Sequence, residues 1–150
     1  MTGGGAGADA RRPGGVEFPF IWPTRVYWED TDAGGVVYHA SYLCFLERAR
    51  TEWLRSLGVG QQALREDADR VFAVRAMRLD FLRPARLDDQ LAVSVELAEC
   101  RRASLVLRQA IVRDGETLLT AEVRVACLAA SDFRPRPLPE AVRAALMLPE

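Results

Sequence analysis

Apolar residues follow two different periods along this chain, and the first is helical. Between residues 40 and 57, apolar side chains recur every three or four positions, as they do on one face of an α-helix. The stripe consists of Tyr42, Leu43, Cys44, Phe45, Leu46, Ala49, Trp53, Leu54 and Leu57. Gly58 follows and is a typical residue for a helix end. The spacing therefore predicts one long, mostly buried helix over 40–57.

After residue 70 the period changes to two. Apolar and polar residues alternate over 91–98 and again over 119–127, which is typical of half-buried strands. Between them, Leu105, Leu107 and Ile111 share a parity with Gln109, and this pattern indicates a third strand. The dipeptide Asp114-Gly115 predicts a tight hairpin that leads into the last strand.

Two further strands complete the predicted sheet. One is a short strand over 25–28, and the other covers 71–82 and ends before Pro84. A weak helical pattern over 61–70 and a short helix over 140–146 are the remaining elements. Long strands joined by tight turns and preceded by one long helix predict an α+β fold, in which an antiparallel sheet of about five strands packs on that helix.

Composition favours a single globular domain over residues 18–150. The chain has 150 residues, of which 49% are apolar, and this is enough to bury a core. Residues 1–17 are rich in glycine and lack an apolar run, so we expect a disordered tail there. No segment resembles a secretory signal or a membrane span, which leads us to expect a cytoplasmic protein.

Charge and cysteine content argue against several kinds of partner. The formal net charge of -1 disfavours nucleic acid, whose binding surfaces usually carry a basic excess. Cys44, Cys100 and Cys127 are widely spaced and odd in number, so we interpret them as small buried thiols of a reducing compartment. With one histidine and no cysteine cluster, we expect neither a metal site nor a cofactor.

Candidate chemistry gathers just before the long helix. There the run 29–39 contains Asp32, the pair Gly34-Gly35 and His39, which is the only histidine of the chain. A helix start offers unpaired backbone N–H groups, so an acid and an imidazole beside it suggest a site that activates water and stabilises an oxyanion. An aspartate before a helix can also be a simple cap or turn residue.

The same residues resemble a known family. Arg25-Val-Tyr-Trp-Glu-Asp-Thr-Asp-Ala-Gly-Gly-Val-Val-Tyr-His-Ala-Ser-Tyr and Phe45-Leu-Glu-Arg-Ala-Arg-Thr-Glu look like the YbgC-type, Tol–Pal-associated acyl-CoA thioesterases. These enzymes are a branch of the hotdog-fold 4-hydroxybenzoyl-CoA thioesterase superfamily. The resemblance continues through Phe81-Leu-Arg-Pro-Ala-Arg-Leu-Asp-Asp, Arg102-Ala-Ser-Leu-Val and Ala121-Glu-Val, so it covers about residues 22–138. It implies a hotdog sheet around a central helix.

The resemblance also implies roles for single residues. Asp32 matches the catalytic carboxylate and His39 matches a histidine near it, while the amides of Tyr38 and His39 match the groups that polarise the thioester carbonyl. Gly35, with Val36 beside it, would leave room for substrate. Some relatives have tyrosine where this chain has Trp28, so no phenol can act at that position.

Coenzyme A brings phosphates, for which basic residues are the natural ligands. The candidates are Arg83, Arg86, Arg101 and Arg102, with Ser104 at the start of a predicted strand. The resemblance implies a homodimer or homotetramer with sites shared between subunits, and it leaves acyl carrier protein open as a second partner.

Several alternatives remain open at this point. Asp32 could act as a general base toward water, which we favour, or as a nucleophile that forms a mixed anhydride. The runner-up function is a hotdog scaffold that binds acyl carrier protein, or acts at the envelope, with little turnover. The acyl group is not predicted, and a link to the Tol–Pal system rests on the resemblance alone.

Overall fold

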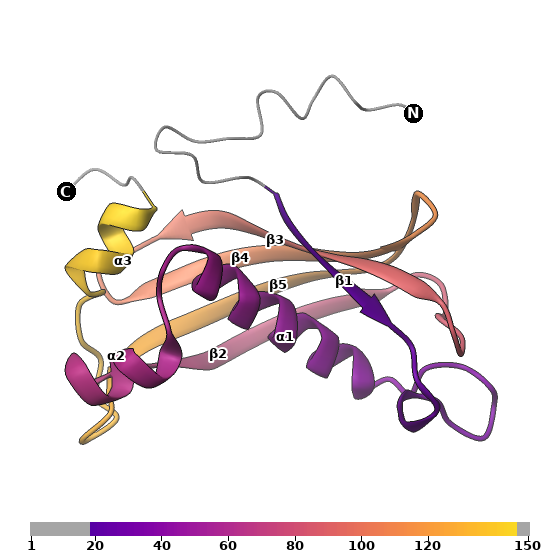
Figure 1. Ribbon diagram of the computed structural model, residues 1–150, viewed down its shortest axis with the longest axis horizontal. Coiled ribbons are helices and arrows are strands. Elements are labelled where there is room, and N and C mark those ends of the chain that lie inside the picture. The colour runs from indigo at the N-terminus through magenta and orange to yellow at the C-terminus, as the bar shows by residue number, and fades with distance from the viewer. Residues whose placement is uncertain (1–18, 147–150) are drawn as a thin grey trace.

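A five-stranded antiparallel sheet wraps around one long helix in the computed structural model, which describes residues 19–146 (Figure 1). The elements in chain order are β1 (Phe20–Arg25), the 3-10 turn η2 (Trp28–Asp30), α1 (Ser41–Ser56), α2 (Gln61–Asp67), β2 (Arg70–Phe81), β3 (Gln90–Cys100), β4 (Ser104–Arg113), β5 (Glu116–Ala129) and α3 (Glu140–Ala145). The predicted α+β class is confirmed. The tail expected over 1–17 lies outside the described residues.

The strands lie in the order β1-β3-β4-β5-β2, so β1 and β2 form the two edges. The first strand was predicted over 25–28, and this prediction was wrong by several residues. Pro23 lies inside β1, where it is tolerated because an edge strand pairs on one side only. The chain then leaves the sheet, and Trp28 begins the η2 turn instead of continuing the strand.

A bulge divides the edge strand β2. Val74 pairs with Val125 of β5 and Ala76 pairs with Arg124, which leaves Arg75 as an extra residue. The bulge shifts the alternation by one position. As a result, side chains on both sides of it face the same helix-covered side of the sheet; they are Phe72, Val74, Met77, Leu79 and Phe81.

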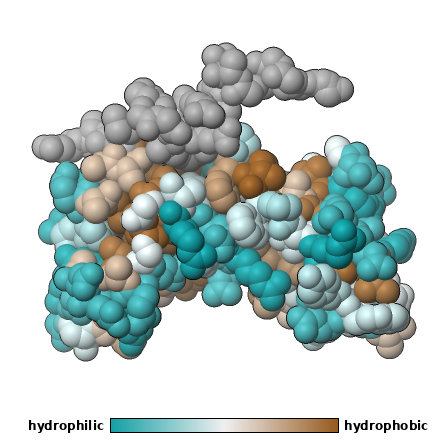
Figure 2. Space-filling model, in the orientation of Figure 1, coloured by the Kyte–Doolittle hydropathy of each residue, from teal (hydrophilic) through white to brown (hydrophobic). Residues whose placement is uncertain are grey.

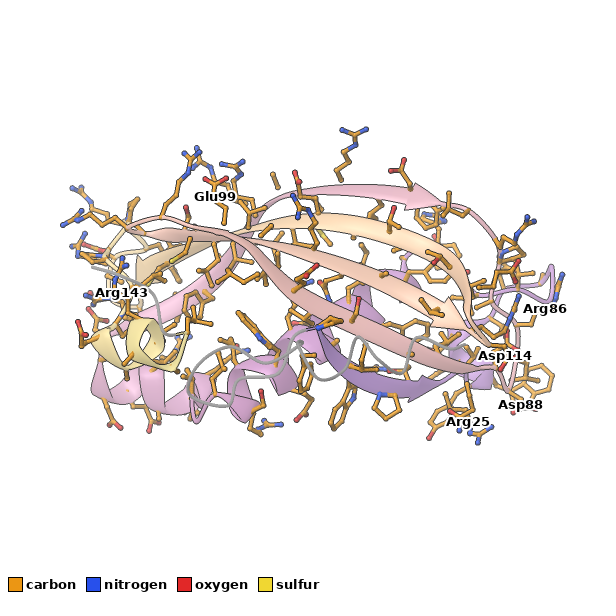
Figure 3. All side chains as sticks on the ribbon, turned by 90° about the horizontal axis from the view of Figure 1, so that it is seen from above. Arg25, Arg86, Asp88, Glu99, Asp114 and Arg143 are labelled. Atoms are coloured by element: carbon orange, nitrogen blue, oxygen red, sulfur yellow. The ribbon has the colours of Figure 1, made fainter. Side chains whose placement is uncertain are left out.

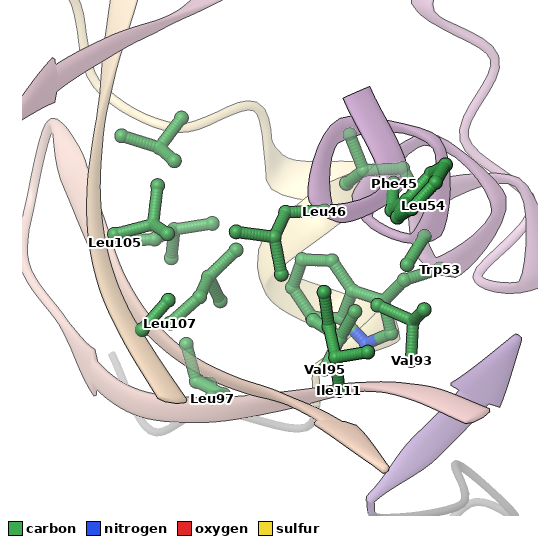
Figure 4. Close-up of a cluster of buried hydrophobic side chains, with 14 of the residues drawn as sticks. Phe45, Leu46, Trp53, Leu54, Val93, Val95, Leu97, Leu105, Leu107 and Ile111 are labelled. Carbon is green, nitrogen blue, oxygen red and sulfur yellow. The ribbon is translucent and has the colours of Figure 1, made fainter. Parts of the chain in front are cut away.

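The helix α1 packs its apolar face against the inner side of the sheet. Figure 4 shows Phe45, Leu46, Trp53 and Leu54 meeting strand residues such as Ile111. The predicted stripe was too wide, because Leu43 is 38% exposed and Cys44 is also exposed. A helix that lies on a sheet buries one face, and residues 43 and 44 lie on its flank. Of the three cysteines, only Cys127 is buried.

The predicted hairpin is confirmed. Asp114 and Gly115 both have positive φ angles, 50° and 80°, as a two-residue type I′ turn between β4 and β5 requires. Gly58 ends the α1 region with a φ of 81°, and short helices occur where residues 61–70 and 140–146 predicted them.

The surface on the side of α1 is mixed in character. Hydrophobic side chains appear there as separate patches among hydrophilic ones (Figure 2). Within residues 19–146, no helix combines the length and the apolar content needed to cross a membrane.

Candidate active site

Backbone hydrogen bonds close the loop that carries Asp32. Thr31 and Val37 form an isolated β-bridge, and between them the amide of Asp32 donates to the carbonyl of Val36 over 2.9 Å. The amide of Gly35 donates back to the carbonyl of Asp32 over 3.0 Å. Gly35 has a φ of 81°, a conformation that glycine adopts without strain. The two substrate-binding candidates of this segment, Gly35 and Val36, therefore build the loop itself.

The carboxylate of Asp32 is held at one oxygen and open at the other. Its Oδ1 accepts the amide of Gly34 over 2.8 Å, and Oδ2 has no hydrogen-bond partner among the described residues. A Cβ at position 34 would lie 3.1 Å from Oδ1, so the close approach favours glycine there. The side chain of Asp32 is exposed in the single chain. It can therefore meet water or substrate with a defined orientation.

The start of α1 offers free N–H groups close in sequence to this loop. Among residues 19–146, the amides of His39, Ala40 and Tyr42 donate to no acceptor. The amide of Tyr38, by contrast, donates to the carbonyl of Asp30 over 2.8 Å. The expectation that Tyr38 supplies a free amide therefore needs correction, because that hydrogen is already engaged within the chain.

His39 lies at the edge of an open hollow. The hollow has a volume of about 280 Å³ and is lined by Val37, His39, Tyr42, Phe81, Leu82, Arg83 and Pro84. The ring of Tyr38 contacts the ring of His39, with 4.4 Å between the two ring centroids. Asp32 does not line this hollow, so in one chain the acid and the imidazole are neighbours in sequence without sharing a closed cavity.

The segment after β2 holds the loop in place. The carbonyl of Ala85 accepts the amide of Val37 over 2.9 Å, and the amide of Ala85 donates to the hydroxyl of Tyr42 over 3.0 Å. Nearby, Asp89 accepts the amide of Arg86 and the guanidinium of Arg113. Burial opposes ionisation of Asp89, but these hydrogen bonds outweigh it and lower the pKa of its carboxyl.

The basic candidates fall at two opposite ends of the sheet. Arg83 lines the hollow beside His39 and pairs with Glu116 over 2.7 Å. Arg101 and Arg102 form the turn between β3 and β4, and Ser104 begins β4. This turn lies at the end of β3 that carries Glu99, whereas Arg25 and Arg86 mark the other end (Figure 3).

The length of β3 separates the two groups within one chain. Eleven residues of strand span about 33 Å, so Arg101, Arg102 and Ser104 cannot reach a thioester beside Asp32 of the same chain. Arg101 pairs with Glu99, and the backbone of Arg102 accepts the amide of Leu138 over 2.8 Å. These residues can serve a site near Asp32 only if a second subunit provides it.

A second hollow follows α1 toward its C-terminal half. It has a volume of about 180 Å³, and polar residues of the helix line it together with apolar side chains of the sheet. Arg50 lines the hollow and donates to Gln109 over 3.0 Å, while Gln109 donates to the carbonyl of Leu46 over 3.1 Å. Burial lowers the pKa of the Arg50 guanidinium, and the charge of Glu47 opposes that shift.

The sequence reasoning missed four features of the second hollow and of the segment before α1. The alternation placed Gln109 at an inward strand position, which signals a buried polar contact. It did not indicate that Arg50 is the partner of Gln109. Nothing in the spacing indicated the free amide of Ala40 or the burial of Asp30. Glu47, which the sequence did not assign to chemistry, lines the second hollow.

A sheet wrapped around one long helix is the hotdog architecture, and an oriented carboxylate before free amides at a helix start is the kind of site that a thioesterase requires. In agreement, the family model of the Thioesterase-like superfamily matches residues 26–146. The crystal structure of a probable thioesterase from Bartonella henselae superposes with a TM-score of 0.76 at 37% identity, covering 79% of this chain and 98% of that one.

Curated relatives narrow the assignment. The acyl-CoA thioester hydrolase YbgC of Escherichia coli O157:H7 is 54% identical over 125 residues, which are 82% of this chain and 92% of the relative. The acyl-CoA thioesterase YbgC of Haemophilus influenzae is 46% identical over 84% of this chain and 93% of its own length. The chain belongs to this YbgC family of acyl-CoA thioester hydrolases, as the resemblance predicted.

Proposed function

We propose that the protein hydrolyses acyl-CoA thioesters with Asp32 as the catalytic carboxylate. The observation that carries this proposal is the orientation of that side chain, because the Gly34 amide holds one oxygen while the other has no partner in the described part of the chain. In the reaction, Asp32 takes a proton from water while the water oxygen bonds to the thioester carbon. The carbon–sulfur bond then breaks, and the departing CoA thiolate takes up the proton that Asp32 received from water, which restores the carboxylate.

The oxyanion that forms on the carbonyl needs hydrogen-bond donors. We assign this role to the amides at the start of α1, with His39 first and Ala40 beside it, because both lack an acceptor among residues 19–146. One such donor typically lowers the barrier by about 3 kcal/mol. The imidazole of His39 orients the water or assists the departing thiolate. Tyr38 contributes by its ring contact with His39 instead of by its amide.

The basic residues fit this chemistry in a dimer. The strand β2 is an edge of twelve residues whose outer side pairs with no other strand among the described residues, and it exposes Val74 and Phe81. If two β2 strands pair in antiparallel fashion, the Arg101–Ser104 end of one subunit lies on the same side as the Asp32 loop of the other. The proposal is a homodimer, or a tetramer of two such dimers, with sites shared between subunits.

The surroundings of the reaction follow from the same assignment. We propose a cytoplasmic enzyme that needs no metal or other cofactor and takes CoA as part of its substrate. Acyl carrier protein is a possible alternative carrier of the acyl group, and a role beside the Tol–Pal system is suggested by the family alone. The competing proposal is a binding scaffold that retains the fold with little turnover.

The substitution Asp32→Asn tests the assignment. We expect a loss of about a thousandfold in kcat with saturating acyl-CoA, because a general base contributes on this scale. Asp132→Asn makes the same chemical change at an exposed carboxylate in the loop that follows β5, and it should leave kcat unchanged. Wild-type protein that binds acyl-CoA without turnover would support the scaffold instead, and a folded Asp32→Asn variant with normal turnover would remove Asp32 from the mechanism.

Isotope labelling tests whether Asp32 takes the covalent route. Single-turnover hydrolysis in heavy-oxygen water should place the label in the acid product when water attacks directly. Label found in the Asp32 carboxylate by mass spectrometry would instead establish the mixed anhydride and overturn the general-base route.

The shared site makes a prediction for Arg102. Arg102→Ala should raise KM for acyl-CoA severalfold, because a bidentate phosphate contact is lost, and should leave a short thioester without the nucleotide unaffected. An equal loss with both substrates would contradict a role in binding CoA.

A further inference from the structure

Asp30 is the only buried carboxylate among residues 19–146, with 7% of its surface exposed. Burial of a carboxylate is costly unless hydrogen bonds satisfy it. Its Oδ2 accepts the amide of Tyr27 over 2.8 Å, and its own amide donates to the carbonyl of Tyr27 over 3.0 Å. The side chain is thus fixed to the backbone at the point where the chain leaves β1.

The backbone carbonyl of Asp30 holds the C-terminal end of the loop that carries Asp32. The carbonyl of Asp30 accepts the amide of Tyr38 over 2.8 Å, one residue before the free amide of His39. The bridge between Thr31 and Val37 lies just inside this contact. Both ends of the segment that contains Asp32 therefore meet at Asp30.

This double contact orients the peptide planes that precede α1. The Tyr38 amide is bonded to Asp30, and the next peptide N–H, that of His39, has no acceptor within residues 19–146. A displacement of Asp30 would move the His39 amide and Asp32 relative to each other. A misplacement on the scale of 1 Å at an active site can cost about a hundredfold in rate.

We propose that Asp30 is a positioning residue that sets the geometry between the Asp32 carboxylate and the His39 amide. The inference rests on the proposed function and deepens it. Asp30 acts through hydrogen-bond geometry and does not touch substrate. An amide side chain can accept the Tyr27 N–H as a carboxylate does, so asparagine should replace aspartate in this role, whereas alanine cannot.

Steady-state kinetics of two variants test the role. For Asp30→Ala we expect kcat to fall at least tenfold while KM stays within twofold, since the reacting geometry is disturbed and substrate binding is not. For Asp30→Asn we expect kcat within threefold of wild type. Asp132→Ala removes a carboxylate that likewise accepts a backbone amide, that of Arg134, and should leave kcat and KM unchanged.

Amide hydrogen exchange supplies a readout that does not depend on turnover. In Asp30→Ala the Tyr38 amide should exchange at least tenfold faster than in wild type, while the core amide of Val123 keeps its rate; in Asp30→Asn both should remain slow. Unchanged Tyr38 exchange or unchanged kcat in Asp30→Ala would overturn the proposal, as would an Asp30→Asn variant as impaired as Asp30→Ala. If wild-type protein fails to hydrolyse thioesters, the proposed function fails, and exchange still decides whether Asp30 holds the loop.

Discussion

The core beneath α1 and the loop around Asp32 are held together by different forces. In the core, side chains such as Phe45, Leu46 and Trp53 are almost fully buried, and their stabilisation grows with the apolar area removed from water. In the loop, Asp32 and its neighbours are exposed, and directed hydrogen bonds from backbone amides define the shape. Stability and activity should therefore respond to different substitutions.

The largest expected effect is on the core side of this comparison. Trp53→Ala should lower the free energy of unfolding by about 3–5 kcal/mol, because it leaves a large cavity between α1 and the sheet. Denaturant titration measures the loss. Trp53→Phe should cost less, since it retains an aromatic ring in the core; both variants remove the indole N–H, which is buried without an acceptor among the described residues. Equal costs for the two variants would show that ring packing is not what stabilises this position.

A substitution in the loop should show the opposite response. Gly34→Ala introduces a Cβ 3.1 Å from the Asp32 oxygen and displaces the carboxylate by a few tenths of an ångström. We expect kcat for acyl-CoA to fall about tenfold, which corresponds to about 1.4 kcal/mol in the activation barrier. The melting temperature should change by no more than a few degrees. A variant with full activity would show that the contact between Gly34 and Asp32 does not orient the acid.

The pH dependence of stability tests the support behind the loop. Hydrogen bonds lower the pKa of Asp89 from its ordinary value of 3.8, so its ionised form stabilises the folded state above that pH. The contribution is lost as the pH falls through the lowered pKa. In Asp89→Asn the free energy of unfolding should depend less on pH below about 4 than in wild type. Parallel unfolding curves of the two proteins at acid pH would contradict this assignment.

The smallest effect is expected at the exposed hairpin turn between β4 and β5, whose two turn residues belong to neither the core nor the Asp32 loop. Asp114→Asn keeps a residue that tolerates positive φ and forms the Asn-Gly pair favoured in type I′ turns. The free energy of unfolding should change by less than about 0.5 kcal/mol, and kcat should not change. A larger loss would mean that the Asp114 carboxylate has contacts in solution beyond the turn.

The sequence predicted the core better than the loop, and the reason is physical. The period of apolar residues reports which face is buried, so the long helix and four strands were found within a few residues. It does not report how wide the buried face is, and Leu43 and Cys44 were therefore misassigned. The first strand was placed too late because Pro23 argues against a strand. Proline is tolerated there because β1 is an edge strand, and the order of strands in the sheet cannot be known from a local pattern.

The candidate site was predicted by residue type and not by hydrogen-bond partner. Asp32 and His39 were singled out from their place before α1, and these assignments remain proposals. That the Tyr38 amide binds Asp30 depends on backbone positions that spacing does not specify. Likewise, the distance between Arg101 and the Asp32 loop follows from the direction of β3, which became known only with the sheet.

The extra residue in β2 has one more consequence. Deletion of Arg75 would leave Phe-Ala-Val-Ala-Met-Arg-Leu-Asp-Phe over this stretch, an uninterrupted alternation with the larger apolar side chains on one side and a straight, regular edge. A straight edge strand of this kind can pair in several registers with strands of unrelated chains or of partly unfolded copies of the same chain. The irregularity thus acts as a safeguard against indiscriminate aggregation, at the cost of one residue that the ladder does not use.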